Sequence, residues 1–184
     1  MTHALALWRR LDTPGHDACA LEQLADGWQL EGTALFLHEG GPARLTYRVV
    51  CDSAWATREG RVDGWLGERR VDFTVVRASG GAWMLNGEVV PGLERYVDLD
   101  LGFTPATNFL QLRRVALGDG ESADVPVVWI DAPPASLTVL PQRYERRDQL
   151  TYWYESPTAG YAGLLELAPN GFVRRYPGLW EMEM

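Results

Sequence analysis

Apolar and polar residues alternate with a period of two along most of the chain. Residues 45–51 are an example, in which larger apolar side chains alternate with others: Leu-Thr-Tyr-Arg-Val-Val-Cys. This period predicts β-strands with one face turned to a core, since successive side chains of a strand point to opposite faces. No stretch keeps the period of 3.6 residues that is typical of a helix. The pattern therefore predicts an all-β or β-dominated protein.

Turn residues separate these runs at intervals of about 8–12 residues, as in antiparallel sheets. The strongest turn signal is Asn86-Gly87, because both residues tolerate the positive φ angles of a two-residue hairpin. Short strands are expected over residues 4–10, 16–24, 28–37, 45–51, 61–66, 69–76, 82–85, 88–90, 95–103, 125–130, 136–140, 142–146, 149–155, 161–167 and 172–176. Residues 57–60 and 131–134 are expected to form turns between strands.

Two segments could open a short helix. Thr104-Pro105 fits a helix start, with Thr as the N-cap and Pro at the first helical position. Residues 16–25 contain helix formers, although their alternation and the following Asp26-Gly27 favour a strand. We therefore expect a single antiparallel β domain over residues 1–184, with one or two short helices.

Charge and aromatic content narrow the possible partners. The net charge of −8 argues against nucleic acid or an anionic membrane as a partner, because both need a basic face. Eight Trp, seven Tyr and five Phe are spread over the chain, and such large side chains fill a core or line a cavity. Both interpretations stay open, a thick closed core and a sheet curled around an apolar ligand cavity. Trp83, Trp129 and Tyr144 are candidates to line such a cavity.

The sequence gives no sign of a metal, a cofactor or an export signal. Cys19 and Cys51 lie in strand-like runs without a Cys-x-x-Cys pattern, so we expect them to pack as small apolar side chains. The three histidines lack the spacing of a metal site, and no serine has a Gly-x-Ser-x-Gly context. The first residues lack the basic and apolar parts of a signal peptide. A cytoplasmic protein without a transmembrane segment, metal or cofactor is therefore expected.

Polar chemistry is concentrated in residues 97–114. Asp98 and Asp100 alternate with apolar residues of a predicted strand, so their carboxylates lie on the face opposite Leu99. A polar turn, Thr-Pro-Ala-Thr-Asn, follows this strand. The candidate site comprises two carboxylates, two hydroxyls, one amide and two guanidiniums: Asp98, Asp100, Thr104, Thr107, Asn108, Arg113 and Arg114.

These residue types allow several roles. Carboxylates two residues apart on a strand lie about 7 Å from one another, which suits acid–base catalysis but is also common on a solvated face. Hydroxyls and amides can bind the hydroxyls of a ligand or cap a turn. An arginine could bind a phosphate or form an ion pair with Asp98 or Asp100. The residues favour binding over catalysis and do not decide whether the protein is an enzyme.

Several motifs occur together along nearly the whole chain. They are Trp28-Gln-Leu-Glu-Gly-Thr-Ala, Trp83-x-x-Asn86-Gly87, Asp98-Leu-Asp100-Leu with Phe103-Thr-Pro-Ala-Thr-Asn108, and Tyr176-Pro177-Gly178-Leu-Trp180. With these motifs the chain resembles the bacterial putative glycolipid-binding family, formerly a domain of unknown function. Tyr96 and the absence of a proline after Leu110 depart from the family pattern. The resemblance implies a single antiparallel curved sheet or half-barrel, similar to periplasmic lipoprotein carriers, with a lipid or glycolipid in its concave face.

The leading hypothesis is therefore non-catalytic binding of a lipid or glycolipid. Its apolar chain would lie in the aromatic-lined concavity, and the polar residues of 98–114 would contact its headgroup. The alternative is an enzyme that acts on a sugar or phosphate conjugate through Asp98, Asp100, Asn108 and Arg113. A third hypothesis is an interaction module with a closed core. The sequence does not define the oligomeric state.

Overall fold

The computed structural model describes residues 2–131 and 136–183, which form β-strands, one α-helix and one 3-10 turn. The elements are, in chain order, β1 (Thr2–Arg10), β2 (Gly15–Leu24), β3 (Gly27–His38), β4 (Gly41–Asp52), β5 (Thr57–Leu66), β6 (Arg69–Arg77), β7 (Trp83–Leu85), β8 (Glu88–Val90), β9 (Leu99–Leu101), α1 (Asn108–Val115), β10 (Ser122–Asp124), β11 (Val127–Ile130), β12 (Thr138–Leu140), β13 (Arg143–Arg146), β14 (Thr151–Ser156), η1 (Pro157–Ala159), β15 (Tyr161–Leu167), β16 (Val173–Tyr176) and β17 (Trp180–Met182). The predicted all-β class is confirmed.

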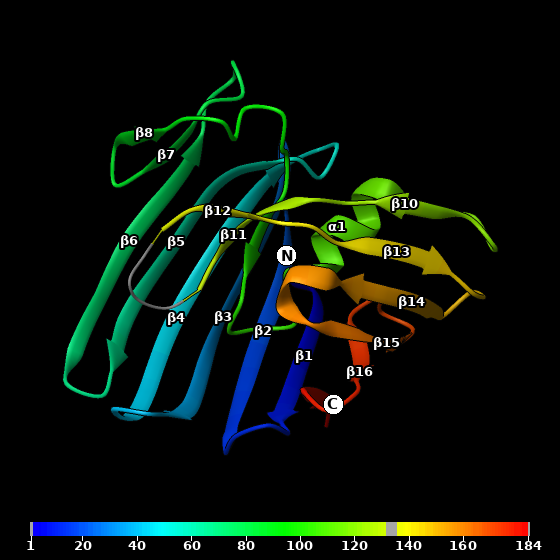
Figure 1. Ribbon diagram of the computed structural model, residues 1–184, viewed down its shortest axis with the longest axis horizontal. Coiled ribbons are helices and arrows are strands. Elements are labelled where there is room, and N and C mark those ends of the chain that lie inside the picture. Colours follow the sequence, from blue (N-terminus) through cyan, green and yellow to red (C-terminus); the bar gives the residue numbers. More distant parts are fainter. Residues whose placement is uncertain (1, 132–135, 184) are drawn as a thin grey trace.

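Fourteen strands form one antiparallel sheet, in the order β10-β13-β14-β15-β16-β17-β1-β2-β3-β4-β5-β6-β7-β8. Its two end strands, β10 and β8, are not paired with each other, so the sheet is open. Figure 1 shows that β1–β6 form one broad wall and β13–β16 a second one, with α1 between them. The sheet is thus curved, as expected.

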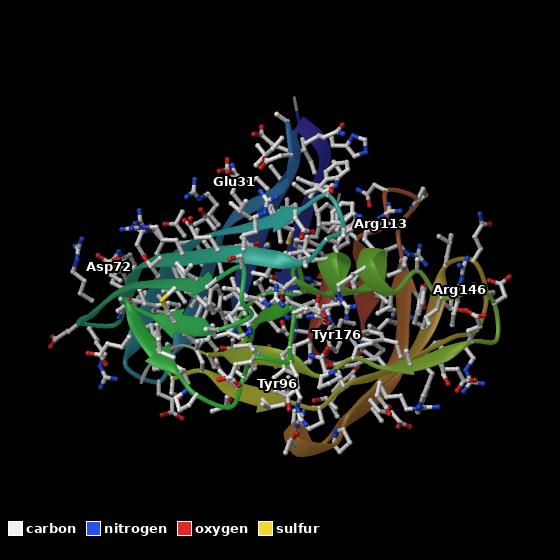
Figure 2. All side chains as sticks on the ribbon, turned by 90° about the horizontal axis from the view of Figure 1, so that it is seen from above. Glu31, Asp72, Tyr96, Arg113, Arg146 and Tyr176 are labelled. Carbon is white, nitrogen blue, oxygen red and sulfur yellow. The ribbon has the colours of Figure 1, made fainter. Side chains whose placement is uncertain are left out.

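The concave side of this sheet is occupied by another part of the same chain, which contains β9, α1, β11 and β12. There β9 pairs in parallel with β11, which pairs with β12, giving a three-stranded sheet. Phe109 of α1 contacts Trp55 on one side and Phe172 on the other, with ring centroids 5.7 and 4.7 Å apart. Phe103 contacts Tyr47 of β4. Side chains from both layers fill the space between them (Figure 2), so the core lies inside the curve.

The helix starts later than its sequence predicts. It begins at Asn108, whereas Thr104-Pro105 was expected to open it. The reason is that the hydroxyl of Thr104 donates to Asp17 of β2 and accepts the N–H of Ala106, which fixes a turn before the helix. Residues 16–25, the other possible helix, lie in strand β2 and its following turn, as their alternation favours.

Some strand boundaries also differ from the prediction. The strand expected over 95–103 is limited to Leu99–Leu101. The turn expected over 57–60 is instead the beginning of β5, where the Thr57 N–H donates to the Val97 carbonyl. Two three-residue strands, β10 and β17, were not expected, because such short strands carry no readable alternation. The turn predicted at 131–134 falls mainly on residues outside those described.

The turn at Asn86-Gly87 is confirmed. Both residues have positive φ angles, 52° and 85°, and they join β7 to β8. The Asn86 side chain also accepts the Thr74 N–H at 2.9 Å, which ties the turn to β6. Cys19 and Cys51 are free and buried, in agreement with the small apolar role expected for them.

Candidate ligand-binding site

Thr104, in the turn before α1, joins the interior segment to the curved sheet. Its hydroxyl donates to the carboxylate of Asp17 on β2, and the hydroxyl of Tyr47 on β4 donates to the same carboxylate at 2.9 Å. All three side chains are buried. Burial raises the pKa of Asp17 to about 6, although both hydrogen bonds act in the opposite direction.

Asp100 joins β9 to Thr107, just before the helix, and to Gln142, just before β13. The Thr107 hydroxyl donates to Asp100 Oδ1 at 2.6 Å, and the Gln142 amide donates to Asp100 Oδ2 at 2.7 Å. Asp100 is 7% exposed. Burial raises the pKa of Asp100, and these hydrogen bonds oppose the rise. The carboxylate therefore serves as a buried acceptor that positions its neighbours.

Asn108 joins α1 to the opposite wall of the sheet. Its amide donates to the Tyr144 hydroxyl of β13 at 2.8 Å, and that hydroxyl donates to Gln111 Oε1 at 2.8 Å. Tyr144 and Gln111 are completely buried. Burial raises the pKa of Tyr144 far above its usual range, so its hydroxyl keeps the proton.

The two arginines of α1 have different surroundings. Arg114 forms a two-pronged ion pair with Asp98, with nitrogen–oxygen distances of 2.7 and 2.8 Å. Asp98 is 1% exposed, and burial raises its pKa while the guanidinium opposes the rise. Arg113 lies on the exposed side of the helix, over the ring of Phe109. Asp98 and Asp100 are both buried, so the face of the predicted strand that carries them is not the solvated face that the alternation allowed.

The aromatic candidates are also part of the interior. Trp83 of β7 is fully buried and donates its indole N–H to the Tyr96 carbonyl at 3.1 Å. Trp129 of β11 is half-buried. Apart from Arg113, the sequence-predicted residues thus lie in the interior layer or its walls, and most of them bond to one another. Direct contact between them and a ligand stays a prediction.

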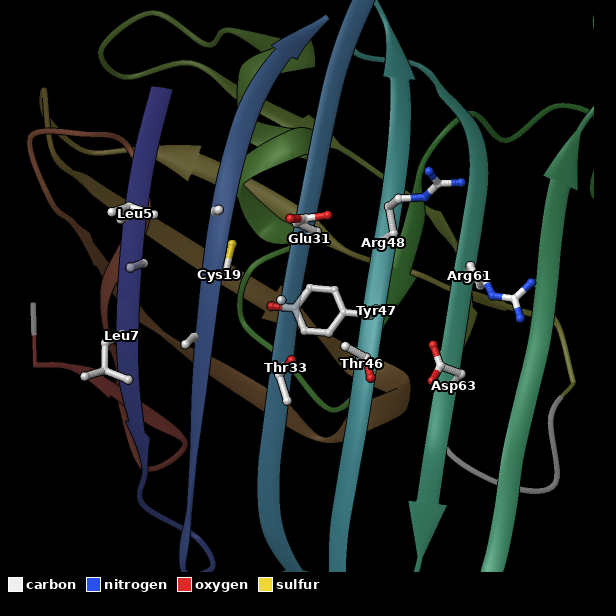
Figure 3. A pocket seen from close by; sticks show the side chains of 14 residues that line it. Leu5, Leu7, Cys19, Glu31, Thr33, Thr46, Tyr47, Arg48, Arg61 and Asp63 are labelled. Atoms are coloured by element: carbon white, nitrogen blue, oxygen red, sulfur yellow. The ribbon is translucent and has the colours of Figure 1, made fainter. Parts of the chain in front are cut away.

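A large cavity forms a trough on the other, outward face of strands β1–β5 (Figure 3). Its volume is about 710 Å³. The strand register explains its shape, because two neighbouring rows of outward side chains cross the five strands. One row is Leu7, Ala18, Thr33, Thr46 and Asp63, and the other is Leu5, Ala20, Glu31, Arg48 and Arg61. We call this feature the outer trough.

Small side chains make the floor of the outer trough low. The floor residues on β2, β3 and β4 are Ala18, Ala20, Thr33 and Thr46. On the inner face of β3, Gly32 leaves room for the ring of Tyr47, with which a Cβ at this position would collide. Without a side chain at Gly32, Tyr47 can cross β3 and reach Asp17. The strands at the trough are thus held from inside by the buried hydrogen bonds of Asp17.

The outer trough changes in chemistry from one end to the other. At β1 it is lined by Leu5, which is 57% exposed, and by Leu7. At β4 and β5 it is lined by Arg48, Arg61 and Asp63. These charges are engaged at the surface only, where Arg48 pairs with Glu59 at 2.9 Å and Arg61 with Asp72 at 3.2 Å. One end of the trough is therefore apolar and the other end charged.

Sequence reasoning missed the outer trough, although a signal for it exists. Outward positions of a solvated strand are usually polar, yet Ala18 and Ala20 occupy them in β2. The sequence does not show which strands are neighbours, and five aligned strands are needed to make one trough. The buried partners Asp17 and Gln142 were missed for the same reason, since they come from distant segments. Gln111 lies within the singled-out segment, but its partner Tyr144 comes from β13.

Two further observations concern the described part of the chain. Within residues 2–131 and 136–183, no helix is long and apolar enough to cross a membrane. In the same residues, no three His, Cys, Asp or Glu side chains come together in a way that could hold a metal ion.

An open, curved antiparallel sheet with an interior layer and a trough on its outer face defines a class of all-β proteins. The chain belongs to the family described as "Putative glycolipid-binding", which matches residues 5–182. The crystal structure of a DUF1089 family protein from Pseudomonas aeruginosa is similar to it, with 28% sequence identity and a TM-score of 0.78. That likeness covers 90% of this chain and 91% of the other one. A comparison with curated proteins gave no significant match.

Proposed function

We propose that the protein binds an amphiphile with a sugar headgroup, and that the outer trough is its binding site. The observation that carries this proposal is the change from apolar to charged lining along one continuous trough. The family description supports the ligand class. The concave side is a less suitable place, because the layer of β9, α1 and β11 occupies it.

The dimensions of the trough suit such a ligand. Adjacent strands lie about 4.8 Å apart, so a path from β1 to β5 is about 19 Å long. An alkyl chain would lie over Leu5 and Leu7 and the alanines of β2, where removal of apolar surface from water favours binding. This part of the trough contains no charged lining residue.

The headgroup would lie at the β4–β5 end. Guanidinium groups donate hydrogen bonds and carboxylates accept them, so Arg48, Arg61 and Asp63 together can bind sugar hydroxyls, which do both. The hydroxyls of Thr33 and Thr46 lie between the two ends. Their ability to donate and accept fits the junction between sugar and alkyl chain.

The direct test uses octyl glucoside below its micellar concentration and measures binding by calorimetry. Thr33→Trp places a large ring on the trough floor and is expected to weaken binding at least tenfold. Thr74→Trp is the matched control, because Thr74 is a half-buried residue of β6 on the same face but outside the trough. Equal affinity of all three proteins would overturn the proposal.

Native mass spectrometry of protein purified without detergent would identify a natural ligand. A bound mass that extracts as a lipid, and that is lost in Thr33→Trp alone, is the expected result. Self-association is the competing explanation for an exposed apolar face. A concentration-dependent dimer that Thr33→Trp disrupts, with no binding of octyl glucoside, would replace the proposed function by self-association.

A further inference from the structure

Another cavity lies beside the exposed side of α1. Its volume is about 350 Å³. One wall comes from α1 and the others from the turns at 146–152 and 167–171. The apolar part of the lining includes Phe109, Leu112, Leu150, Tyr152 and Leu167. We call it the helix pocket.

Arg113 gives this pocket an uncompensated positive charge. It forms no ion pair with any residue in the described ranges, although the chain carries 25 acidic side chains against 17 basic ones. Its only hydrogen bond there is a long one, 3.5 Å, to the Asn170 carbonyl. A guanidinium has five N–H donors, so most of those of Arg113 remain available to a ligand.

The other arginine of the pocket is already engaged. Arg146 donates to the Leu117 carbonyl at 2.6 Å and to the Asp148 carbonyl at 3.0 Å, and it pairs with Asp119 at 2.9 Å. Figure 2 shows Arg113 and Arg146 at the same end of the molecule. Arg146 therefore shapes the pocket wall, and Arg113 is the group that can recognise an anion.

The turn at Asn170-Gly171 keeps room for the Arg113 guanidinium. Gly171 has a φ of 92°, and a Cβ there would lie 2.7 Å from Nη2 of Arg113. The Asn170 amide donates to the Leu5 carbonyl at 3.0 Å, and its oxygen accepts the Phe172 N–H at 3.1 Å. Because these hydrogen bonds tie the turn to β1, the fold itself keeps the space beside Arg113 open.

We infer that the helix pocket binds an anion that carries a short apolar chain, with the anionic group at Arg113. A carboxylate or phosphate would accept paired hydrogen bonds from the guanidinium. The chain would lie against Leu112, Leu150 and Tyr152. A charge alone would bind weakly at this exposed position, so the apolar walls must supply part of the affinity. This site is independent of the outer trough and of the proposed function.

Octanoate is the probe. Acetate is the control that carries only the carboxylate, and octanol is the control that carries only the alkyl chain. Binding is measured from the movement of backbone amide resonances in two-dimensional NMR spectra. We expect octanoate to bind at least tenfold more tightly than acetate or octanol, with the largest shifts in residues 109–116 and 149–152. Equal affinity for octanoate and octanol, shifts elsewhere, or no binding of octanoate would overturn the inference.

Arg113→Gln is the decisive variant, because it removes the positive charge of an exposed side chain and loses only the contact of the guanidinium with the ring of Phe109 and its long hydrogen bond to Asn170. It is expected to weaken octanoate binding about tenfold, the size of one hydrogen-bonded charge pair. Arg143→Gln is the matched control, because Arg143 is an exposed arginine of β13 that does not line the pocket. If both variants bind octanoate as the unchanged protein does, Arg113 is not the recognition group and the inference fails.

Discussion

Asp17 is a buried carboxyl group that connects the curved sheet to the interior segment. It lies beneath the outer trough, on the inner face of β2, and accepts hydrogen bonds from Thr104 and Tyr47. Its burial makes the ionised form unfavourable, which raises its pKa to about 6. The carboxyl group therefore changes charge close to neutral pH, inside the folded protein.

The stability of the fold should depend on pH through Asp17. Its pKa is higher in the folded than in the unfolded state, where 3.8 applies. Its contribution is therefore complete below about pH 4 and is lost as the pH rises through 6, by about 3 kcal/mol in total. Asp17→Asn should remove this dependence in urea unfolding at pH 4 to 7. Asp72→Asn, on the outer face, is the control, and an equal pH dependence in all three proteins would contradict the prediction.

Tyr144 is the central residue of the other buried network. Tyr144→Phe keeps the ring but leaves the Asn108 amide and the Gln111 oxygen without their 2.8 Å partners. Buried groups without partners cost about 1–3 kcal/mol, so the free energy of unfolding should fall by that amount. Tyr161→Phe removes a half-buried hydroxyl and should cost less. If the two variants lose similar free energies of unfolding, the buried network around Tyr144 stabilises the fold no more than a single half-buried hydrogen bond does.

For the helices and strands, how well the sequence predicts an element depends on whether the interactions that form it lie within one stretch of sequence. The hairpins β2–β3 and β5–β6 could be predicted, because their long alternation and their turns lie within one stretch of sequence. Residues 97–115 could be singled out as unusual, but their role could not be predicted. Their polar side chains find partners on β2, β4 and β13, and sequence spacing does not show which distant strands will be close.

Helix α1 should depend on its ion pair with the segment before β9. Arg114→Met leaves the Asp98 carboxylate, which is 1% exposed, without its cation. Loss of one partner of a buried pair costs about 3–5 kcal/mol, and this loss should appear in thermal and urea unfolding. Arg143→Met breaks the exposed pair with Asp124 and should cost less than about 1 kcal/mol. A small loss in Arg114→Met would mean that the ion pair contributes little, and that apolar packing and the hydrogen bonds of Asn108 and Gln111 hold α1.

In the whole molecule, one open sheet separates two faces that differ in what covers them. Its concave side is filled by β9, α1 and β11, which make a core with buried hydrogen bonds. Its outer side carries the trough over β1–β5. The all-β class and the curved antiparallel sheet could be predicted from alternation, turns and family motifs. The position of the cavity could not, because it depends on the register of five neighbouring strands.

The location of a bound amphiphile tests this account most directly. Backbone amide resonances of the protein would be followed in two-dimensional NMR spectra during titration with octyl glucoside below its micellar concentration. We expect the shifts to concentrate in residues 5–7, 18–20, 31–33, 46–48, 61 and 63, which line the outer trough. Shifts concentrated in residues 98–115 instead would place the ligand in the interior layer and contradict the account.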